Sequence, residues 1–369
     1  MADNNPAPRL PAAQRGSLPT AHATPGRPAA LCGLVLLLAS LLLCAPVAQA
    51  ARGVRAAILV NLDTGRVLFE KRADTPIPPA SLTKVMSMFL TLDAVSAKRL
   101  RLTEKIRIPA VAAAVGGSSM HLRAGERVTV RALLAGAAVA SGNDAITALA
   151  LRVGGSQRRF VQNMNRKARA LGLRNTTFKN PSGLPAAGQH STPRDMAALA
   201  RAYLKVHPEA LPFHSTHAIS HRRRFLPNTN TLLGVTPGVN GLKTGWTVAS
   251  GYNIIVTAAR GKTRLLAVVM GGSSRSARDA TAAALLEAGF RHGNNSKQIY
   301  AAMGQRYSPP RQSLGVQPAS PQARPKPKAA ARPQARPKPQ AQGAPNPPPQ
   351  RKAAPRSQRN AKPAPSKTR

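Results

Sequence analysis

Runs of mainly apolar residues indicate two pairs of short strands, one pair near each end of the central part of the chain. Residues 56–62 and 66–71 are rich in apolar and β-branched side chains and flank a glycine-containing turn at 63–65. Residues 252–258 and 264–270 repeat this pattern around a second glycine turn. Each pair predicts an antiparallel β-hairpin.

Between the hairpins, apolar residues recur with the spacing of helices that bury one face. One predicted helix has a clear start, because Thr192 can accept an N-cap hydrogen bond and Pro193 suits the first helical position. Strands at both ends with helices between them predict an α+β domain, in which the two hairpins join one antiparallel sheet flanked by helices. The predicted helices span residues 81–95, 130–138, 143–153, 158–171, 194–206 and 277–290.

The first fifty residues have the pattern of an export signal. Three arginines precede an uncharged apolar run at 29–45, and Ala48-Gln49-Ala50 has small residues at the expected cleavage position. We therefore expect residues 1–50 to be a signal peptide for export to the periplasm or extracytoplasmic cell envelope, with an uncleaved anchor as the alternative. Both cysteines, Cys32 and Cys44, lie in this segment, so disulfides and thiol chemistry are not expected in the mature chain.

The formal net charge of +42 divides into +2 over residues 1–50, +26 over 51–307 and +14 over 308–369. The last segment has no acidic or aromatic residue and is rich in proline, so it cannot form a core. The expected organisation is a folded domain over 51–300 and a disordered Pro/Lys/Arg-rich tail over 301–369. Aromatic residues make up only 3% of the chain, which argues against a specific nucleic-acid partner.

Ser81 and Lys84 lie three residues apart at the start of a predicted helix, so their side chains project from the same face. A neutral lysine within hydrogen-bond reach can remove the serine proton, and burial or neighbouring positive charge lowers a lysine pKa toward that state. The pair is a candidate nucleophile and general base. Taken alone, the pattern is expected about once by chance in a chain of this length.

Two further polar tripeptides follow in order. Ser141-Gly142-Asn143 falls between two predicted helices, where a glycine turn can aim a hydroxyl and an amide the same way. Lys243-Thr244-Gly245 precedes the second hairpin and is predicted to lie on an edge strand, whose glycine lets a ligand backbone approach closely. Each tripeptide alone fits a helix cap or a surface turn better. Three such coincidences in this order are improbable.

The motifs SLTK, SGN and KTG in this order resemble those of the active-site serine penicillin-binding proteins and serine β-lactamases. The surrounding sequence is similar to the D-alanyl-D-alanine carboxypeptidase family of serine peptidases, and this resemblance covers residues 51–293. It implies a penicillin-binding protein/serine β-lactamase-like catalytic domain. The segments that carry the closer likeness are residues 79–84, 171–176, 180–184 and 241–245.

The resemblance implies that Ser81 is the nucleophile, Lys84 its general base and Ser141 a proton relay. The expected reaction removes the terminal D-alanine of peptidoglycan stem pentapeptides through an acyl-enzyme on Ser81, without a metal or cofactor. β-Lactams resemble this substrate and are expected to inhibit by acylating the same serine.

Substrate binding is implied for a second set of residues. Asn143 would hold the peptide carbonyl of the substrate, and Lys243 with Thr244 would bind the terminal carboxylate. Gly245 and Trp246 continue this strand, and the backbone N–H groups of Ser81 and Trp246 would form the oxyanion hole.

Three alternatives follow from the same motifs. A class A-like β-lactamase needs an acidic residue after the second motif to activate the deacylating water, and no Asp or Glu lies between Asp144 and Asp195. A D,D-endopeptidase that cleaves peptidoglycan cross-links uses the same acyl chemistry and is the main alternative. A non-catalytic wall-binding protein is disfavoured by the intact serine and lysines.

The basic tail is expected to contact anionic envelope surfaces, with a solvated linker as the alternative.

Some positions depart from the family pattern. Asn240 stands where the family usually has aspartate, and residues 248–250 lack the commoner acidic side chain. Both departures concern the support of Lys243 rather than its identity. Arg278 has two interpretations, since it could attract the substrate carboxylate or instead pair with Asp279 or a neighbouring strand.

A metal site would require His214, His217 and His221 to share one helical face, which their spacings of three and four permit. Three arginines follow at 222–224 and no carboxylate lies nearby in the sequence. We therefore expect exposed histidines and no metal.

Overall fold

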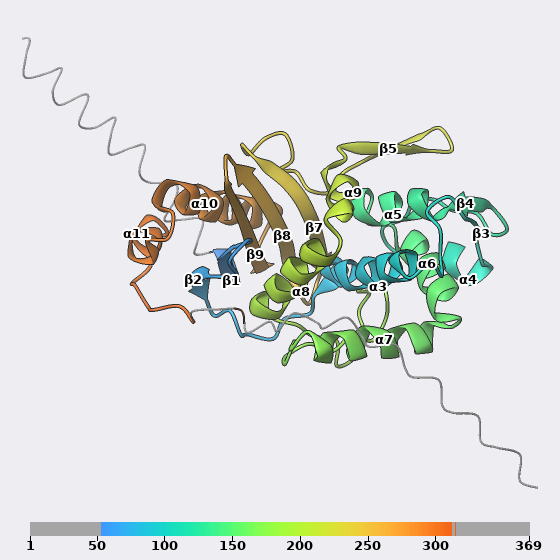
Figure 1. Ribbon diagram of the computed structural model, residues 1–369, viewed down its shortest axis with the longest axis horizontal. Coiled ribbons are helices and arrows are strands. Elements are labelled where there is room, and N and C mark those ends of the chain that lie inside the picture. Colours follow the sequence, from blue (N-terminus) through green and yellow to red (C-terminus); the bar gives the residue numbers. More distant parts are fainter. Residues whose placement is uncertain (1–52, 312–313, 315–369) are drawn as a thin grey trace, which may run out of the picture. The chain divides into compact units, whose positions relative to one another are not determined.

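The computed structural model describes residues 53–311 and 314. It contains a five-stranded antiparallel sheet with the strand order β2-β1-β9-β8-β7 (Figure 1). The two predicted hairpins join through the pairing of β1 with β9, in which Ile58 lies opposite Val268. This confirms the α+β class and the joining of the two predicted hairpins in one sheet. The strands are β1 (Val54–Asn61), β2 (Val67–Lys71), β7 (Val239–Thr247), β8 (Gly251–Arg260) and β9 (Thr263–Gly272).

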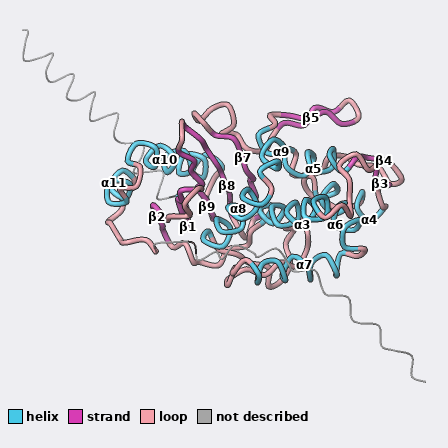
Figure 2. The backbone as a smooth tube through the Cα atoms, in the orientation of Figure 1, coloured by secondary structure: helices cyan, strands magenta, loops and turns pink. Residues whose placement is uncertain are grey.

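Helices cover both faces of the sheet, which explains why its strands are apolar at nearly every position. On β1, Ile58 and Val60 belong to the core that the sheet shares with the central helices, whereas Ala57 and Leu59 belong to a second core on the other face. Figure 2 shows the helices on the two sides of the strands. The first core contains residues of α3 (Lys84–Ser96) and α8 (Pro193–Val206), and the second contains residues of α10 (Arg275–His292) and α11 (Ser296–Ala302).

The remaining predicted helices are present with ends within a few residues of those expected. Thr192 caps α8 as predicted, because its hydroxyl accepts a hydrogen bond from the amide of Asp195 at 3.1 Å. These helices pack beside α3 in the part of the chain between the two hairpins. They are α5 (Val130–Val139), α6 (Asn143–Gly154) and α7 (Gln157–Ala170). Helices α4 (Ala110–Ala113), α9 (Leu211–Ser215) and α11 were not predicted, and a short 3-10 turn, η3 (Pro208–Ala210), precedes α9.

The structure also differs from the predicted elements at the start of α3 and in two small sheets. Helix α3 begins at Lys84 rather than Ser81, because Ala80 has a φ of +49° and the 3-10 turn η2 (Ala80–Thr83) precedes the helix. Two small two-stranded sheets were not predicted, since their strands are only three or four residues long. They are formed by β3 (Lys105–Arg107) with β4 (Arg127–Thr129), and by β5 (Ala218–His221) with β6 (Arg224–Pro227).

The described fold continues past residue 300. Helix α11 ends at Ala302, and Tyr307 packs edge-on against Tyr300 with ring centroids 5.5 Å apart. Within residues 53–311, no helix has both the length and the apolar character needed to cross a membrane. The predicted signal peptide and residues 315–369 of the predicted tail lie outside the described residues.

Candidate active site

Ser81 lies on η2, where three segments distant in sequence meet. A side chain at position 245 of β7 would place a Cβ 2.9 Å from the amide nitrogen of Ser81, so this strand packs directly against the turn that carries the serine. At position 183, which has a φ of +86°, a Cβ would lie 1.8 Å from the carbonyl oxygen of Ala80. Both glycines are therefore required by close packing, and the glycine of KTG makes room for the backbone of η2.

Lys84 is fully buried and its ammonium nitrogen has three oxygen neighbours. Nζ lies 2.8 Å from Ser81 Oγ, 2.7 Å from Asn143 Oδ1 and 2.7 Å from the carbonyl oxygen of Ser182. The Asn143 amide is oriented by a second contact, because its Nδ2 donates to the carbonyl of Gly116 at 2.7 Å. The structure thus joins the first and second predicted motifs at one lysine.

The second motif forms the predicted turn between α5 and α6. Ser141 has a φ of +57° and is buried, and Asn143 is the first residue of α6. The neighbouring Asp144 is a buried carboxylate that anchors the loop opposite. It accepts hydrogen bonds from the amides of Met120 and Leu122, both at 3.0 Å, and from the hydroxyl of Ser119 at 2.6 Å. This loop follows Gly116, the residue that orients Asn143.

The third motif lies on the edge strand β7, as predicted. Lys243 is 1% exposed, and its Nζ donates to the carbonyl of Thr244 at 3.0 Å. The Thr244 hydroxyl donates to the hydroxyl of Thr229 at 2.8 Å. Trp246 is 55% exposed, with its ring 5.8 Å from that of Tyr252. The strand therefore presents a buried ammonium group and an exposed indole within four residues.

Electrostatics favour a neutral Lys84. Burial lowers its pKa well below 10.5, the charge of Lys243 lowers it further, and the charge of Asp144 opposes this shift. Lys243 is itself affected, since burial and the charge of Arg278 lower its pKa to about 7. Arg278 pairs with Asp279, its Nε donating to Oδ1 at 2.8 Å, which is one of its two expected interpretations.

Sequence reasoning missed several groups that complete this site. The carbonyl of Ser182, the carbonyl of Gly116, the hydroxyl of Thr229 and the carboxylate of Asp144 were not among the expected site residues. Ser182 falls inside residues 180–184, one of the family-like segments, and Asp144 directly follows the second motif. The sequence therefore gave a reason to consider Ser182 and Asp144 as site residues, whereas it gave no reason to consider Gly116 and Thr229.

The expectation that all three histidines are exposed was wrong. Helix α9 ends at Ser215, so His217 lies in the connection and His221 on strand β5. His214 is fully buried rather than exposed, with Nδ1 2.9 Å from the carbonyl oxygen of Leu242 and Nε2 3.2 Å from the hydroxyl of Tyr203. No group of three potential metal ligands occurs among the described residues.

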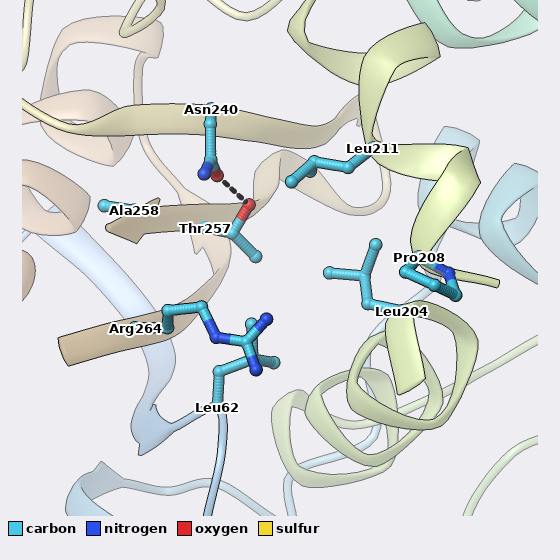
Figure 3. Close-up of a pocket in the computed structure, with 8 residues that line it drawn as sticks. All are labelled: Leu62, Leu204, Pro208, Leu211, Asn240, Thr257, Ala258 and Arg264. Carbon is cyan, nitrogen blue, oxygen red and sulfur yellow. Dashed lines mark hydrogen bonds between the residues drawn. The ribbon is translucent and has the colours of Figure 1, made fainter. Parts of the chain in front are cut away.

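A small pocket lies between the sheet and helices α8 and α9 (Figure 3). Its volume of about 60 Å³ suits a few water molecules rather than a peptide. Asn240 borders this pocket and accepts a hydrogen bond from the Thr257 hydroxyl at 2.8 Å. None of the predicted site residues lines it. Asn240, which departs from the family pattern, therefore lines a separate pocket, although it is only three residues before Lys243 in the sequence.

The sequence from residue 45 to residue 274 matches the family model described as D-alanyl-D-alanine carboxypeptidase. The chain belongs to the D-alanyl-D-alanine carboxypeptidase family. It is 39% identical over 247 residues to the D-alanyl-D-alanine carboxypeptidase DacF of Bacillus subtilis (strain 168), covering 66% of this chain and 63% of the relative. It is 41% identical over 244 residues to DacC of Escherichia coli (strain K12), covering 64% and 61%.

Solved structures agree with this family membership. Penicillin-binding protein D2 from Listeria monocytogenes in its ampicillin-bound form shares 34% identity and a TM-score of 0.59, covering 64% of this chain and 97% of that one. The same Listeria protein also has a cefotaxime-bound structure. The chain spans about three-fifths of the length of the curated carboxypeptidases it matches.

Proposed function

We propose that this member of the family is a serine D-Ala-D-Ala carboxypeptidase that removes the terminal D-alanine of peptidoglycan stem pentapeptides. Ser81 is the nucleophile, Lys84 the general base and Ser141 the proton relay. The observation that carries this proposal is the set of three oxygens around Lys84 Nζ.

Two of those oxygens can only accept hydrogen bonds. The carbonyl of Ser182 has no proton, and the contact with Gly116 orients Asn143 so that its oxygen faces Lys84. A neutral amine has two N–H groups and one lone pair. The two acceptors use both N–H groups, so the lone pair is left for the hydroxyl proton of Ser81, 2.8 Å away. Because burial and Lys243 both lower the Lys84 pKa, this neutral form is favoured.

The reaction then follows from this arrangement. Lys84 takes the hydroxyl proton as Ser81 Oγ forms a bond to the carbonyl carbon of the last peptide bond. The C–N bond breaks when that proton passes to the leaving amine of D-alanine, with Ser141 as the relay. Water then adds to the ester, and the serine recovers its proton as the shortened peptide leaves.

Recognition of the substrate falls to the second set of residues. Asn143 holds the peptide carbonyl, while Lys243 and Thr244 bind the terminal carboxylate. An ammonium group with so little exposure strengthens a charge-assisted contact to that carboxylate. Gly245 lets β7 approach the amide of Ser81 on η2 closely, which supports an oxyanion hole formed by the amides of Ser81 and Trp246.

The test is mass spectrometry of muropeptides after incubation with the purified full chain and with a Ser81→Ala variant. We expect loss of one D-alanine from monomeric pentapeptides, absent in the variant. Cleavage of cross-linked dimers would instead identify a D,D-endopeptidase. No Ser81-dependent change in either substrate would contradict an enzymatic function and favour a wall-binding protein.

β-Lactams provide a second test of the same chemistry, since the Listeria relative has been solved with ampicillin and cefotaxime bound. We expect penicillin to acylate Ser81, seen as a covalent mass increase that the Ser81→Ala variant lacks. The matched variant Ser87→Ala removes another buried serine hydroxyl from the same region, on α3, and should still be labelled.

We also propose that the protein acts in the periplasm or cell envelope and that its basic tail contacts anionic envelope surfaces. The support is the apolar run at 29–45 and the charge of +14 over residues 308–369. A chain ending at residue 314 should bind isolated envelopes less than the full chain at low salt. Equal binding would contradict the proposal for the tail.

A further inference from the structure

The hairpin formed by β5 and β6, residues 218–227, has an unusual tip. Arg222 and Arg223 connect the two strands and have φ values of +49° and +62°. A two-residue turn with both residues in the left-handed region is normally occupied by Asn and Gly, because a β-carbon is disfavoured there. The chain instead places two arginines at the turn, where they reduce the stability of the hairpin.

The side chains at this tip are exposed. Arg222, Arg223 and Arg224 are followed by Phe225, which is 72% exposed and lies opposite Ser220 on the neighbouring strand. No ion pair joins these three arginines to an acidic residue in the described part of the chain. An exposed phenyl ring directly after three exposed guanidinium groups is a feature that neither the core nor the candidate active site explains.

The hairpin is held in place against the rest of the domain. At its base, Asn228 Nδ2 donates to the carbonyls of His214 and Thr216 at 3.1 and 2.8 Å. Near its tip, His221 Nε2 lies 3.0 Å from Glu126 Oε1, just before β4. Figure 1 shows the hairpin lying along α5 and reaching toward β4.

The contact with Glu126 brings the hairpin beside a second basic element. In the β3–β4 pair, Arg107 lies directly opposite Arg127, and both side chains are exposed. Like charges at directly opposed positions repel, and a bound anion relieves that repulsion. Arg123, also exposed, precedes Glu126 by three residues. Within the described residues, the arginines of the β5–β6 hairpin and of the β3–β4 pair therefore carry positive charge that no ion pair neutralises.

We propose that the β5–β6 hairpin docks the folded domain on an anionic lipid membrane. The arginines contact the lipid phosphates and Phe225 inserts at the boundary between headgroups and acyl chains, an arrangement typical of interfacial membrane contacts. The exposed ring favours a membrane over a soluble polyanion, because charge alone would bind a polymer and gives no role to a phenyl group. This docking is independent of the proposed peptidase activity.

The test must separate the hairpin from the tail, since the +14 tail can bind anionic vesicles by charge alone. The chain contains a single tryptophan, Trp246. The full chain carrying Trp246→Phe and Phe225→Trp therefore reports fluorescence from the hairpin tip only. The unaltered chain, with its exposed indole on β7, is the matched control.

We expect the emission of the Phe225→Trp chain to move to shorter wavelength on vesicles of phosphatidylglycerol and phosphatidylcholine. Lipids brominated on their acyl chains should quench it, vesicles of phosphatidylcholine alone should leave it unchanged, and Trp246 in the control should not respond. Unchanged emission from a chain that sediments with the vesicles would overturn the proposal. So would an equal shift with heparin and no quenching by brominated lipid, which would indicate a polymer site.

A charge variant that keeps the turn favourable provides a second test. Arg222→Asn with Arg223→Gly supplies the preferred turn residues, so the hairpin should become more stable while losing two charges. Vesicle binding of the full chain should fall about tenfold at physiological salt. The matched variant Arg158→Gln with Arg159→Gln, on α7, removes the same charge elsewhere and should change binding less than about twofold. Equal losses in both variants would overturn the proposal.

Discussion

The charge of Lys243, on the edge strand β7, lowers the pKa of Lys84, on helix α3. Two positively charged lysines in a site with little water repel each other, which favours loss of the proton from one of them. Here that lysine is Lys84, the proposed general base, which must be neutral to accept a proton. The lysine proposed to bind the substrate carboxylate therefore also prepares the general base. Asp144 acts in the opposite direction, since its charge raises the Lys84 pKa. Removing the charge of Lys243 and removing the charge of Asp144 should therefore shift the Lys84 pKa in opposite directions.

Replacing Lys243 by Met should raise the pKa of Lys84, because one repelling charge is lost. Lys84 is active as a base only when neutral, so the acidic limb of the acylation rate should move to higher pH. The rate is best measured with an activated ester that has no carboxylate, which avoids the role of Lys243 in binding. Lys243→Arg keeps the charge and should leave the limb near its original pH. An unchanged limb in Lys243→Met would contradict the coupling.

Replacing Asp144 by Asn should move the same acidic limb to lower pH, since the charge that favours protonated Lys84 is gone. The variant should also lose about 1–3 kcal/mol of stability, because an amide cannot accept all the hydrogen bonds from the 119–122 loop. Thermal unfolding measures that loss, and the ester assay measures the limb. A shift of the acidic limb to higher pH would contradict the predicted effect of the Asp144 charge on the Lys84 pKa.

The sequence predicted those parts of the site that depend on local spacing. Ser81 and Lys84 are three residues apart, so any helical turn brings them together, and the turn at Ser141 follows from its glycine neighbour. The carbonyl of Ser182 could not be predicted, because it reaches Lys84 from 98 residues away through tertiary packing. Backbone carbonyls also carry no residue-specific signal.

The same reasoning explains which parts of the fold were missed. The long hairpins of the sheet have strands of five to ten residues with a clear apolar pattern. The β5–β6 hairpin has four-residue strands and arginine in place of the usual turn residues, so its sequence gives no turn signal. His214 was expected to be exposed because the sequence does not reveal that its short helix packs against β7. In the structure its side chain contacts Leu242, 28 residues away, and Tyr203, 11 residues away.

A β-carbon at position 183 should disturb the nucleophile turn. Gly183→Ala places that carbon against the carbonyl of Ala80, at 1.8 Å before any relaxation, so the backbone beside Ser81 must move. Gly261→Ala is the matched control, since Gly261 also has a positive φ but has open space around it. The control should lose only about 1 kcal/mol from backbone strain. Gly183→Ala should lose about 1–3 kcal/mol more, together with penicillin labelling of Ser81. Equal stability of the two variants would contradict this packing.

His214 should make the protein sensitive to mild acid. Burial lowers its pKa from 6.5 to about 4, so the folded protein keeps this imidazole neutral while the unfolded chain binds a proton. A group of this kind contributes its full stability above about pH 6.5, and that stability is lost progressively as the pH falls to about 4. The loss should approach about 3 kcal/mol, measured by urea unfolding at successive pH values. His214→Gln retains an amide N–H for the carbonyl of Leu242 but cannot titrate, so the difference in unfolding free energy between the two proteins should shrink as the pH falls. A difference that stays constant across this range would mean that His214 does not titrate on unfolding.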